Sequence, residues 1–325
     1  MPSSKPYRVL SLDGGGVRGL LAAIWLARLE QKLGAPVREY FDLVAGTSTG
    51  GIIACAVSLG IPAERMVQMY RDEADEVFPA PSSRLWNRLS RTLSEGLSAP
   101  RYSDRGLETV LKRIFGDARF GQLQVKPTLL TSYDTLNRTA IVFKNTKQAH
   151  AELPVWEVCK SSASAPSYFP AHVMRLEGQD IPLVDGGVVA NNPTACAIAE
   201  GIRINESLPM TERVGLDQFI VASFGTGQTN RPISAREARE WGALEWALPI
   251  VDVLFDGSAD SVDYIARQLI AEGNYFRFQT PLDKAYDDLD RSDRANMSAL
   301  NRIADDYLKL RGGEGLLDKL VKVLI

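Results

Sequence analysis

Three short glycine-containing segments carry residue types and spacing that suggest chemistry. The first spans residues 13–19 (DGGGVRG), between a strand-like run and a helix-like run. Consecutive glycines let backbone N–H groups approach a ligand closely, and a helix N-terminus adds positive potential. This segment therefore predicts an anion hole, either for a bound phosphate or for an oxyanion that develops during a reaction.

The second segment, residues 46–50 (GTSTG), has the G-x-S-x-G form of a nucleophile elbow. In such an elbow the serine occupies a strained turn between a strand and a helix, and the residues two before and two after it must be small. Ser48 would then be the nucleophile, supported by Gly46 and Gly50. The flanks fit, because Phe41–Ala45 is strand-like and Gly51–Leu59 is helix-like. A turn without chemistry is the alternative.

The third segment, Asp185-Gly186-Gly187, follows the strand-like run Ile181–Val184. A carboxylate at the carboxyl end of a strand lies at the edge where α/β proteins bind ligands. A simple turn-forming Asp-Gly pair explains the same residues without chemistry.

The scarcity of histidine restricts the mechanism. A Ser-His-Asp triad needs a histidine, and the two present, His150 and His172, have no flanking motif that suggests catalysis. If Ser48 is a nucleophile, a carboxylate must act on it directly. An ordinary aspartate has a pKa near 4, so desolvation must make that carboxylate more basic. The glycine loop would hold the oxyanion, and Arg18 would add positive charge nearby.

The elements that must position these segments alternate between strand and helix. Strand patterns fall at Tyr7–Leu12, Phe41–Ala45, Pro127–Tyr133, Thr139–Phe143, His172–Leu176, Ile181–Val184 and Gln218–Ser223. Helical patterns fall at Val17–Leu33, Gly51–Leu59, Leu107–Phe115, Pro154–Ser162 and Pro193–Ile202. This alternation predicts a mostly parallel, doubly wound sheet covered on both faces. We expect one domain, with an α/β core over residues 7–227 and a mainly helical part over 228–325, interrupted by the aromatic run Asn274–Phe278.

Composition sets the broad class of the protein. The 325 residues are 45% hydrophobic and 24% charged, as in ordinary globular proteins, and the net charge of −3 argues against a nucleic-acid polymer as partner. The longest apolar stretch, Leu20–Ala27, is too short to cross a membrane, and no apolar leader precedes the first strand. Three scattered cysteines predict neither a disulfide framework nor a zinc cluster. A reduced, cytoplasmic protein of enzyme size is expected.

Together the three segments resemble the patatin-like phospholipase family. Residues 13–20 (DGGGVRGL), 46–50 (GTSTG) and 185–187 (DGG) match its three motif blocks in the family's order. Residues 161–170 (SSASAPSYFP) are similar to the block that precedes the catalytic aspartate in that family. The resemblance extends from Tyr7 to about Gly227, and less specifically into the helical remainder.

The resemblance implies a mechanism and a fold. It implies a catalytic dyad of Ser48 and Asp185 and an oxyanion hole from the backbone amides of Gly14, Gly15 and Gly16, with Gly186 and Gly187 in support. It also implies a three-layer α/β/α sandwich, no metal or other cofactor, and hydrolysis of glycerolipid acyl esters through an acyl-serine intermediate. Some bacterial members are membrane-degrading effectors that nucleotide signals switch on in anti-phage defence. The resemblance therefore raises a nucleotide second messenger as an activator.

A hydrolase of membrane phospholipid must touch an interface, so we expect peripheral membrane contact. Residues 79–102 could form a lid or contact element, with Trp86, Leu89 and Leu93 on an apolar stripe among arginines. The same stripe would equally suit a surface helix packed on the core. The stretch Trp241–Phe255 presents the same choice.

Two other classes of protein compete with the hydrolase. Residues 14–19 satisfy the G-x-G-x-x-G pattern of dinucleotide-binding oxidoreductases, but the acidic residues near the required distance, Glu39 and Asp42, do not end the second strand. A non-catalytic lipid-binding or storage protein on the same fold is the other alternative. The sequence leaves the head group, the acyl preference and the oligomeric state open.

Overall fold

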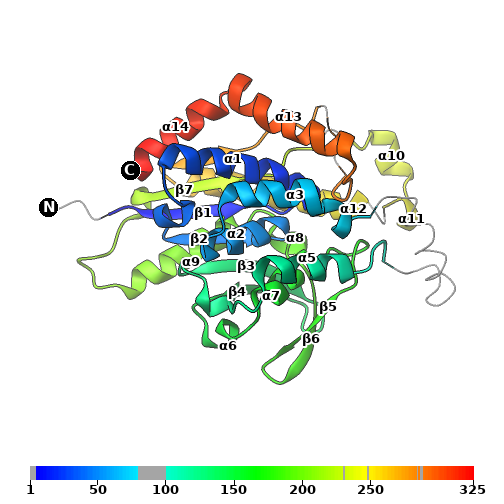
Figure 1. Ribbon diagram of the computed structural model, residues 1–325, viewed down its shortest axis with the longest axis horizontal. Helices are drawn as coiled ribbons and strands as arrows, with labels where there is room; N and C mark the ends of the chain where they lie inside the picture. The colour runs from blue at the N-terminus through cyan, green and yellow to red at the C-terminus, as the bar shows by residue number, and fades with distance from the viewer. Residues whose placement is uncertain (1–4, 80–99, 230, 247–248, 284, 286–287) are drawn as a thin grey trace.

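The computed structural model describes residues 5–79, 100–229, 231–246, 249–283, 285 and 288–325. A single eight-stranded sheet runs through the middle of the molecule (Figure 1). Its strands are β1 (Tyr7–Leu12), β2 (Leu43–Thr47), β3 (Thr128–Asp134), β4 (Thr139–Lys144), β5 (His172–Leu176), β6 (Gln179–Asp185), β7 (Phe219–Phe224) and β8 (Tyr275–Phe278). All seven strand patterns noted in the sequence are strands, and the aromatic run supplies the eighth.

The sheet is parallel at its centre and antiparallel at one edge. The order β5-β6-β3-β2-β1-β7-β8 contains five mutually parallel strands, from β3 to β8. Strands β4 and β6 both pair with β3 in the antiparallel sense, and β5 pairs with β6 likewise. The expected mostly parallel sheet is therefore confirmed.

Helices cover both faces of this sheet. One face carries α1 (Gly19–Leu33), α2 (Thr49–Leu59), α3 (Ala63–Val77), α5 (Arg105–Phe115), α7 (Val155–Ala163), α13 (Arg294–Leu310) and α14 (Gly313–Leu324). The other carries α9 (Thr194–Ser207) and α12 (Pro249–Leu269), with the short α8 (Gly187–Ala190) beneath α12. Neighbouring strand residues accordingly enter different cores: Leu10 and Val44 join the larger one, while Val9 and Leu43 join the smaller. This is the three-layer α/β/α sandwich that the motifs implied.

The C-terminal part contributes to both the sheet and its cover. Strand β8 extends the sheet beside β7, and α13 packs on α1, where Trp25 Nε1–H donates a hydrogen bond to the Ala304 carbonyl at 3.1 Å. The remaining helices of this part are the short α10 (Ala235–Glu240) and α11 (Ala243–Trp246). No helix in the described part of the chain is long and apolar enough to span a bilayer.

One helix was not predicted from the sequence, and one predicted element cannot be compared with the structure. Helix α3 did not stand out in the sequence, although Met66, Tyr70, Ala74 and Val77 recur at helical spacing and the first three of them are buried. The contact element expected around Trp86, Leu89 and Leu93 lies outside the described residues.

Candidate active site

Strand β3 brings Ser48 and Asp185 together. Its edge opposite β4 pairs first with β2 and then with β6: Thr47 is in register with Thr131, and Asp185 with the next residue, Ser132. Since β2 runs parallel and β6 antiparallel to β3, their carboxyl ends meet head to head. Ser48 follows β2 directly, and its Oγ–H donates a hydrogen bond to Asp185 Oδ2 at 2.6 Å. Both residues therefore lie at the carboxyl ends of their strands, as predicted, and their side chains are in direct contact.

Ser48 occupies the strained backbone expected of a nucleophile elbow. Its φ of 54° and ψ of −123° lie outside the favoured regions for a residue with a side chain. A Cβ at Gly46 would overlap the Gly50 carbonyl, and a Cβ at Gly50 would overlap the Leu12 carbonyl. The small residues of G-x-S-x-G therefore let the turn close against β1. The Ser48 amide donates to Ser162 Oγ at 2.8 Å, which fixes the elbow to α7.

Asp185 is buried and has few partners. Asp185 is only 1% exposed, and its Oδ1 accepts a hydrogen bond from the Gly187 amide at 2.7 Å. Burial raises the pKa of Asp185 to about 7, against the lowering effect of the hydrogen bonds from Ser48 and Gly187. The carboxylate is therefore far more basic than an ordinary aspartate, as a direct base for a serine hydroxyl must be.

The glycine loop lies against Ser48, since a Cβ added at Gly14 would be 3.3 Å from Ser48 Cβ. The Gly14 amide donates to the Asn191 carbonyl at 2.9 Å, so it is already engaged. The amides of Gly15 and Gly16 have no hydrogen-bond partner among the described residues. Of the three amides expected to form the oxyanion hole, those of Gly15 and Gly16 therefore remain as candidate donors in the described part of the chain. Arg18 is buried at the end of the 3-10 helix η1 (Gly16–Arg18), and it does not line the cavity beside Ser48.

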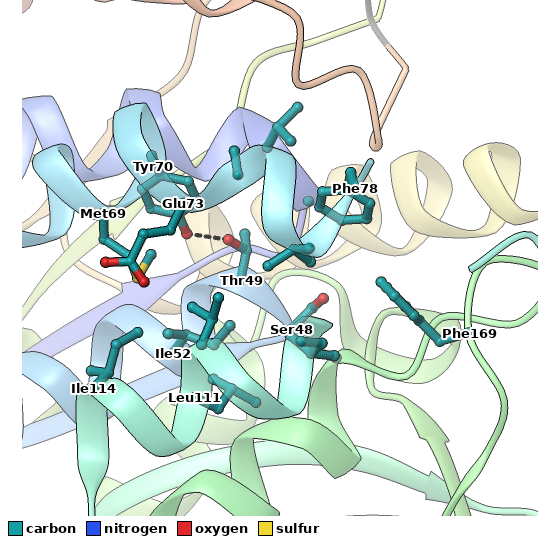
Figure 2. Close-up of a pocket in the computed structure, with 17 residues that line it drawn as sticks. Ser48, Thr49, Ile52, Met69, Tyr70, Glu73, Phe78, Leu111, Ile114 and Phe169 are labelled. Carbon is teal, nitrogen blue, oxygen red and sulfur yellow. Dashed lines mark hydrogen bonds between the residues drawn. The ribbon is translucent and has the colours of Figure 1, made fainter. Parts of the chain in front are cut away.

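An apolar cavity opens beside Ser48. It encloses about 580 Å³ of space not filled by atoms, its open mouth included, and its walls come mainly from α3 and α5. Figure 2 shows Phe78 and Phe169 on one side of Ser48, and Met69 and Ile114 on the other. The other lining residues are Gly16, Val17, Thr49, Ile52, Tyr70, Glu73, Ala74, Val77, Leu107, Val110, Leu111 and Ala163. Such an apolar lining suits an acyl chain.

The sequence analysis did not predict this cavity, because it did not predict helix α3, which forms one of the walls. Tyr70 hydrogen-bonds Thr49, next to Ser48 (Figure 2). Glu73, which also lines the cavity, forms an ion pair with Arg113 at 2.8 Å. The helical spacing of apolar residues over 66–77 was the signal that could have found this wall.

Both histidines have partners outside the Ser48–Asp185 pair, and neither takes the place of Asp185 beside Ser48. His150 Nδ1 accepts a hydrogen bond from the Lys144 amide, and burial lowers the pKa of His150 to about 4. His172 Nε2 lies 3.2 Å from Glu157 Oε1. Within the described ranges, no group of three or more His, Cys, Asp or Glu side chains is arranged to hold a metal ion.

A strained serine beside a buried carboxylate, at the wall of an apolar cavity, is typical of hydrolases that act on lipid esters. The chain belongs to the patatin-like phospholipase family: the family model described as "Patatin-like phospholipase" matches residues 10–198, more than half of the chain. This membership supports a lipid hydrolase and argues against a dinucleotide-binding oxidoreductase.

Individual relatives agree with the family assignment. Patatin-like protein 1 of Arabidopsis thaliana is 30% identical over 93% of this chain and 81% of its own. The probable inactive patatin-3-Kuras 1 of Solanum tuberosum is 26% identical over 93% of this chain and 86% of its own. Among solved structures, human GIVD cytosolic phospholipase A2 superposes with a TM-score of 0.51 at 11% identity, over 100% of this chain and 61% of that one. That likeness concerns the fold.

Proposed function

We propose that the protein is a serine acyl hydrolase that cleaves acyl esters of membrane phospholipids. The observation that carries this proposal is the 2.6 Å hydrogen bond from Ser48 Oγ to Asp185 Oδ2 at the wall of an apolar cavity. One relative bears the name "Probable inactive patatin-3-Kuras 1", so the proposal rests on the residues of this site and not on family membership alone. The intact Ser48–Asp185 pair argues for catalysis rather than for lipid storage.

The geometry supports a two-step acyl transfer. Ser48 Oγ attacks the ester carbonyl carbon while its proton passes to Asp185, and the amides of Gly15 and Gly16 bind the oxyanion. Collapse of the tetrahedral intermediate breaks the bond to the lysolipid oxygen, which takes the proton from Asp185. A water molecule then attacks the acyl-serine and gives a proton to Asp185. As the bond to Ser48 Oγ breaks and the fatty acid leaves, Asp185 returns this proton to Ser48 Oγ, which restores both side chains.

Fatty-acid release from mixed phospholipid vesicles by the purified protein tests this function. Release is expected, and a soluble activated ester serves as the second substrate because it needs no interface. Activity on the soluble ester alone would indicate that access to the membrane is gated, as in an enzyme that awaits an activator. Inactivity on both substrates would favour a non-catalytic protein.

The cavity should set the acyl-chain length. The run from Leu107 to Ile114 on α5 rises about 10 Å, a span that an extended chain of about eight carbons fills. Replacing Ile114 with Trp at the end remote from Phe169 should slow hydrolysis of a soluble decanoyl ester at least ~10-fold, with the butyryl ester nearly unaffected. Steady-state rates on both esters measure this.

Thr109→Trp is the matched control for this substitution, because Thr109 is an exposed residue of the same helix. It should leave both esters unaffected. Equal losses on the two esters in Ile114→Trp would show general damage rather than a shortened cavity.

Helix α12 presents the best-supported surface for peripheral membrane contact. Of the stretch Trp241–Phe255, Val251 and Phe255 pack inward, and Phe255 lies against Gly187, two residues beyond Asp185. The outward face of α12 carries large apolar side chains that are 40–68% exposed: Ile250, Val253, Leu254, Tyr264, Ile265 and Leu269. The exposed apolar face and the loop that follows the proposed base therefore lie on opposite sides of the same helix.

The charges beside this apolar face favour a zwitterionic surface. Four aspartates (Asp252, Asp256, Asp260 and Asp263) and one arginine (Arg267) lie on the same helix. Exposed apolar residues insert into the headgroup region, whereas acidic neighbours are repelled by anionic lipid. We therefore expect stronger binding to phosphatidylcholine vesicles than to vesicles rich in phosphatidylserine.

Replacing Leu254 and Ile265 together with Glu should lower vesicle hydrolysis at least ~10-fold, with the soluble ester changed little. Vesicle co-sedimentation should fall in parallel. The double variant Met210→Glu, Leu310→Glu is the matched control, since both residues are exposed and lie outside α12. If the control loses as much vesicle activity, the added charge and not the face of α12 is responsible.

A further inference from the structure

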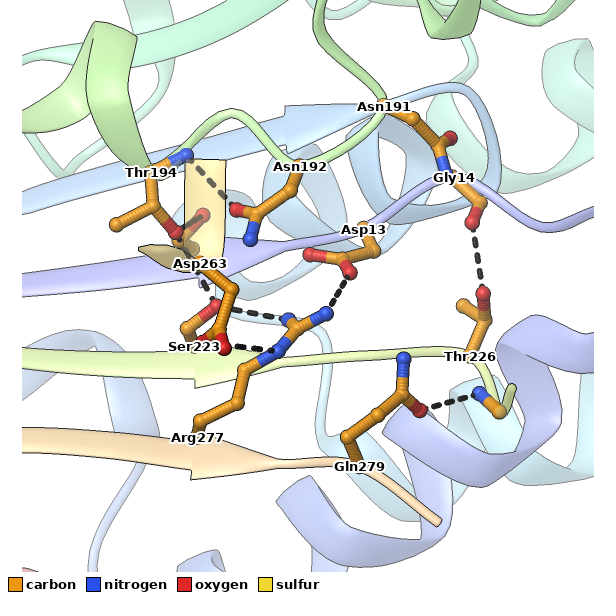
Figure 3. Close-up of polar contacts among 12 residues, drawn as sticks. Asp13, Gly14, Asn191, Asn192, Thr194, Ser223, Thr226, Asp263, Arg277 and Gln279 are labelled. Atoms are coloured by element: carbon orange, nitrogen blue, oxygen red, sulfur yellow. Dashed lines mark hydrogen bonds and ion pairs between the residues drawn. The ribbon is translucent and has the colours of Figure 1, made fainter. Parts of the chain in front are cut away.

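A buried ion pair holds the glycine loop from the far end of the chain. Arg277 Nη2 on β8 lies 2.6 Å from Asp13 Oδ2, and the side chains are 6% and 1% exposed. Asp13 is the residue that joins β1 to the glycine loop. Figure 3 shows the Arg277 side chain reaching over β7, where its Nη1 donates to Ser223 Oγ at 2.9 Å, to meet Asp13.

The strand register explains why arginine suits this position. Ser11, Ser223 and Arg277 lie side by side across β1, β7 and β8. A long side chain on β8 is therefore needed to cross β7 and reach the end of β1. A forked guanidinium binds Ser223 and Asp13 at once, which the single ammonium of lysine cannot reproduce in the same geometry.

The charge of Arg277 also keeps Asp13 in its buried position. Burial raises the pKa of Asp13, and the adjacent Arg277 opposes this rise. Among the described residues Asp13 Oδ1 has no hydrogen-bond partner, and Asp13 Oδ2 makes the hydrogen bond to Arg277. Without the guanidinium, a buried carboxylate would be left uncompensated at the start of the loop.

Other contacts fix the rest of the same loop. Thr226 Oγ1 donates to the Gly14 carbonyl at 2.7 Å (Figure 3), and the Val17 amide donates to the Leu289 carbonyl at 2.9 Å. Gly15 and Gly16, whose amides are free among the described residues, lie between these two attachment points. Because Gly16 lines the cavity beside Ser48, the direction in which these two amides point depends on where Asp13 and Gly14 are held.

We propose that Arg277 is a positioning residue for the oxyanion hole: by holding Asp13, it aims the amides of Gly15 and Gly16 at the oxyanion formed on Ser48. This inference rests on the proposed function of Ser48. It gives the C-terminal part, which lies beyond the matched residues 10–198, a direct share in the chemistry.

Kinetics on a soluble butyryl ester test this role. In Arg277→Gln, kcat should fall about 10²-fold with KM within ~3-fold of wild type, because a small misplacement of an oxyanion donor affects only the transition state. Arg277→Lys keeps the cation but not the fork, and should recover part of kcat. The midpoint of the pH profile should not move, since Asp185 sets it. Arg311→Gln, which removes a half-exposed arginine of the same part, should match wild type.

A double variant keeps the test decisive if Arg277→Gln folds poorly. Asp13→Asn with Arg277→Met leaves no uncompensated charge and should melt near the wild-type temperature, since buried ion pairs can be replaced without loss of stability. Its kcat should nevertheless stay low, because residue 13 at the start of the loop has lost its ion pair to β8.

The outcomes separate this inference from the proposed function. If wild type hydrolyses the ester, Ser48→Ala does not, and either Arg277→Gln or the folded double variant matches wild type, only the role of Arg277 is overturned. If wild type hydrolyses neither the ester nor vesicles, both fall together. Low kcat with unchanged KM in both variants supports the role.

Discussion

Ser48→Ala is expected to release fatty acid from mixed phospholipid vesicles at least ~10³-fold more slowly than wild type. The Ser48 hydroxyl is the group that the proposed mechanism acylates, and alanine leaves the cavity and the glycine loop in place. Substrate should still bind. Vesicle co-sedimentation should therefore be unchanged while release measured by titration or mass spectrometry falls.

Ser207→Ala provides the control for this comparison, because Ser207 is an exposed serine at the end of α9. It should release fatty acid as wild type does. Equal release by wild type and Ser48→Ala would exclude Ser48 as the nucleophile, whatever the fate of Asp185. Loss of vesicle binding in Ser48→Ala would instead indicate that the substitution disturbs more than the chemistry.

The local parts of this site could be predicted from the sequence because their causes are local. Gly46 and Gly50 are needed wherever a serine must turn sharply between a strand and a helix, so the motif and its flanks predict the elbow together. The sequence pattern predicts the strand before Ser48 at Phe41–Ala45, two residues earlier than the observed strand Leu43–Thr47. That error does not move the serine from the end of the strand.

The pairing of the strands could not be predicted in the same way. Each strand pattern reports burial, but not which neighbour it will have or in which direction that neighbour runs. The contact between Ser48 and Asp185 requires β6 to turn antiparallel and to meet β2 on one edge of β3, at Thr131 and Ser132. The family resemblance supplied the partner, and the structure supplies the reason.

The role of Arg277 illustrates a longer-range limit. It contacts Asp13 across 264 positions of sequence, and neither residue has a local pattern that points to the other. The aromatic run around it indicated an element distinct from the helices nearby, which proved to be β8. Only the order β1-β7-β8 shows which loop its side chain can reach.

Removal of Asp185, the proposed base, should also have a large effect. The burial of Asp185 should make activity rise and stability fall as the pH increases. Asp185→Asn should lower hydrolysis of a soluble ester by about 10²–10⁴-fold, because an amide cannot accept the proton of Ser48. Wild-type activity should fall as the pH drops through about 7, where Asp185 becomes protonated. The residual activity of Asp185→Asn should lack this step, and an unchanged midpoint in the variant would assign the titration to another group.

Stability should respond to the same titration in the reverse direction. The folded pKa of about 7 lies above that of an unfolded aspartate, so the folded state holds the proton more tightly. The contribution of Asp185 to stability is therefore complete below about pH 4 and is lost as the pH rises through about 7. Asn carries no such charge, so the free energy of unfolding of Asp185→Asn relative to wild type should increase between pH 5 and pH 8, on the order of a few kcal/mol. Melting curves at both pH values measure this, and a constant difference would show that the carboxylate is not desolvated. The burial that makes Asp185 basic enough to activate Ser48 is thus the same burial that weakens the fold at the pH where the enzyme works.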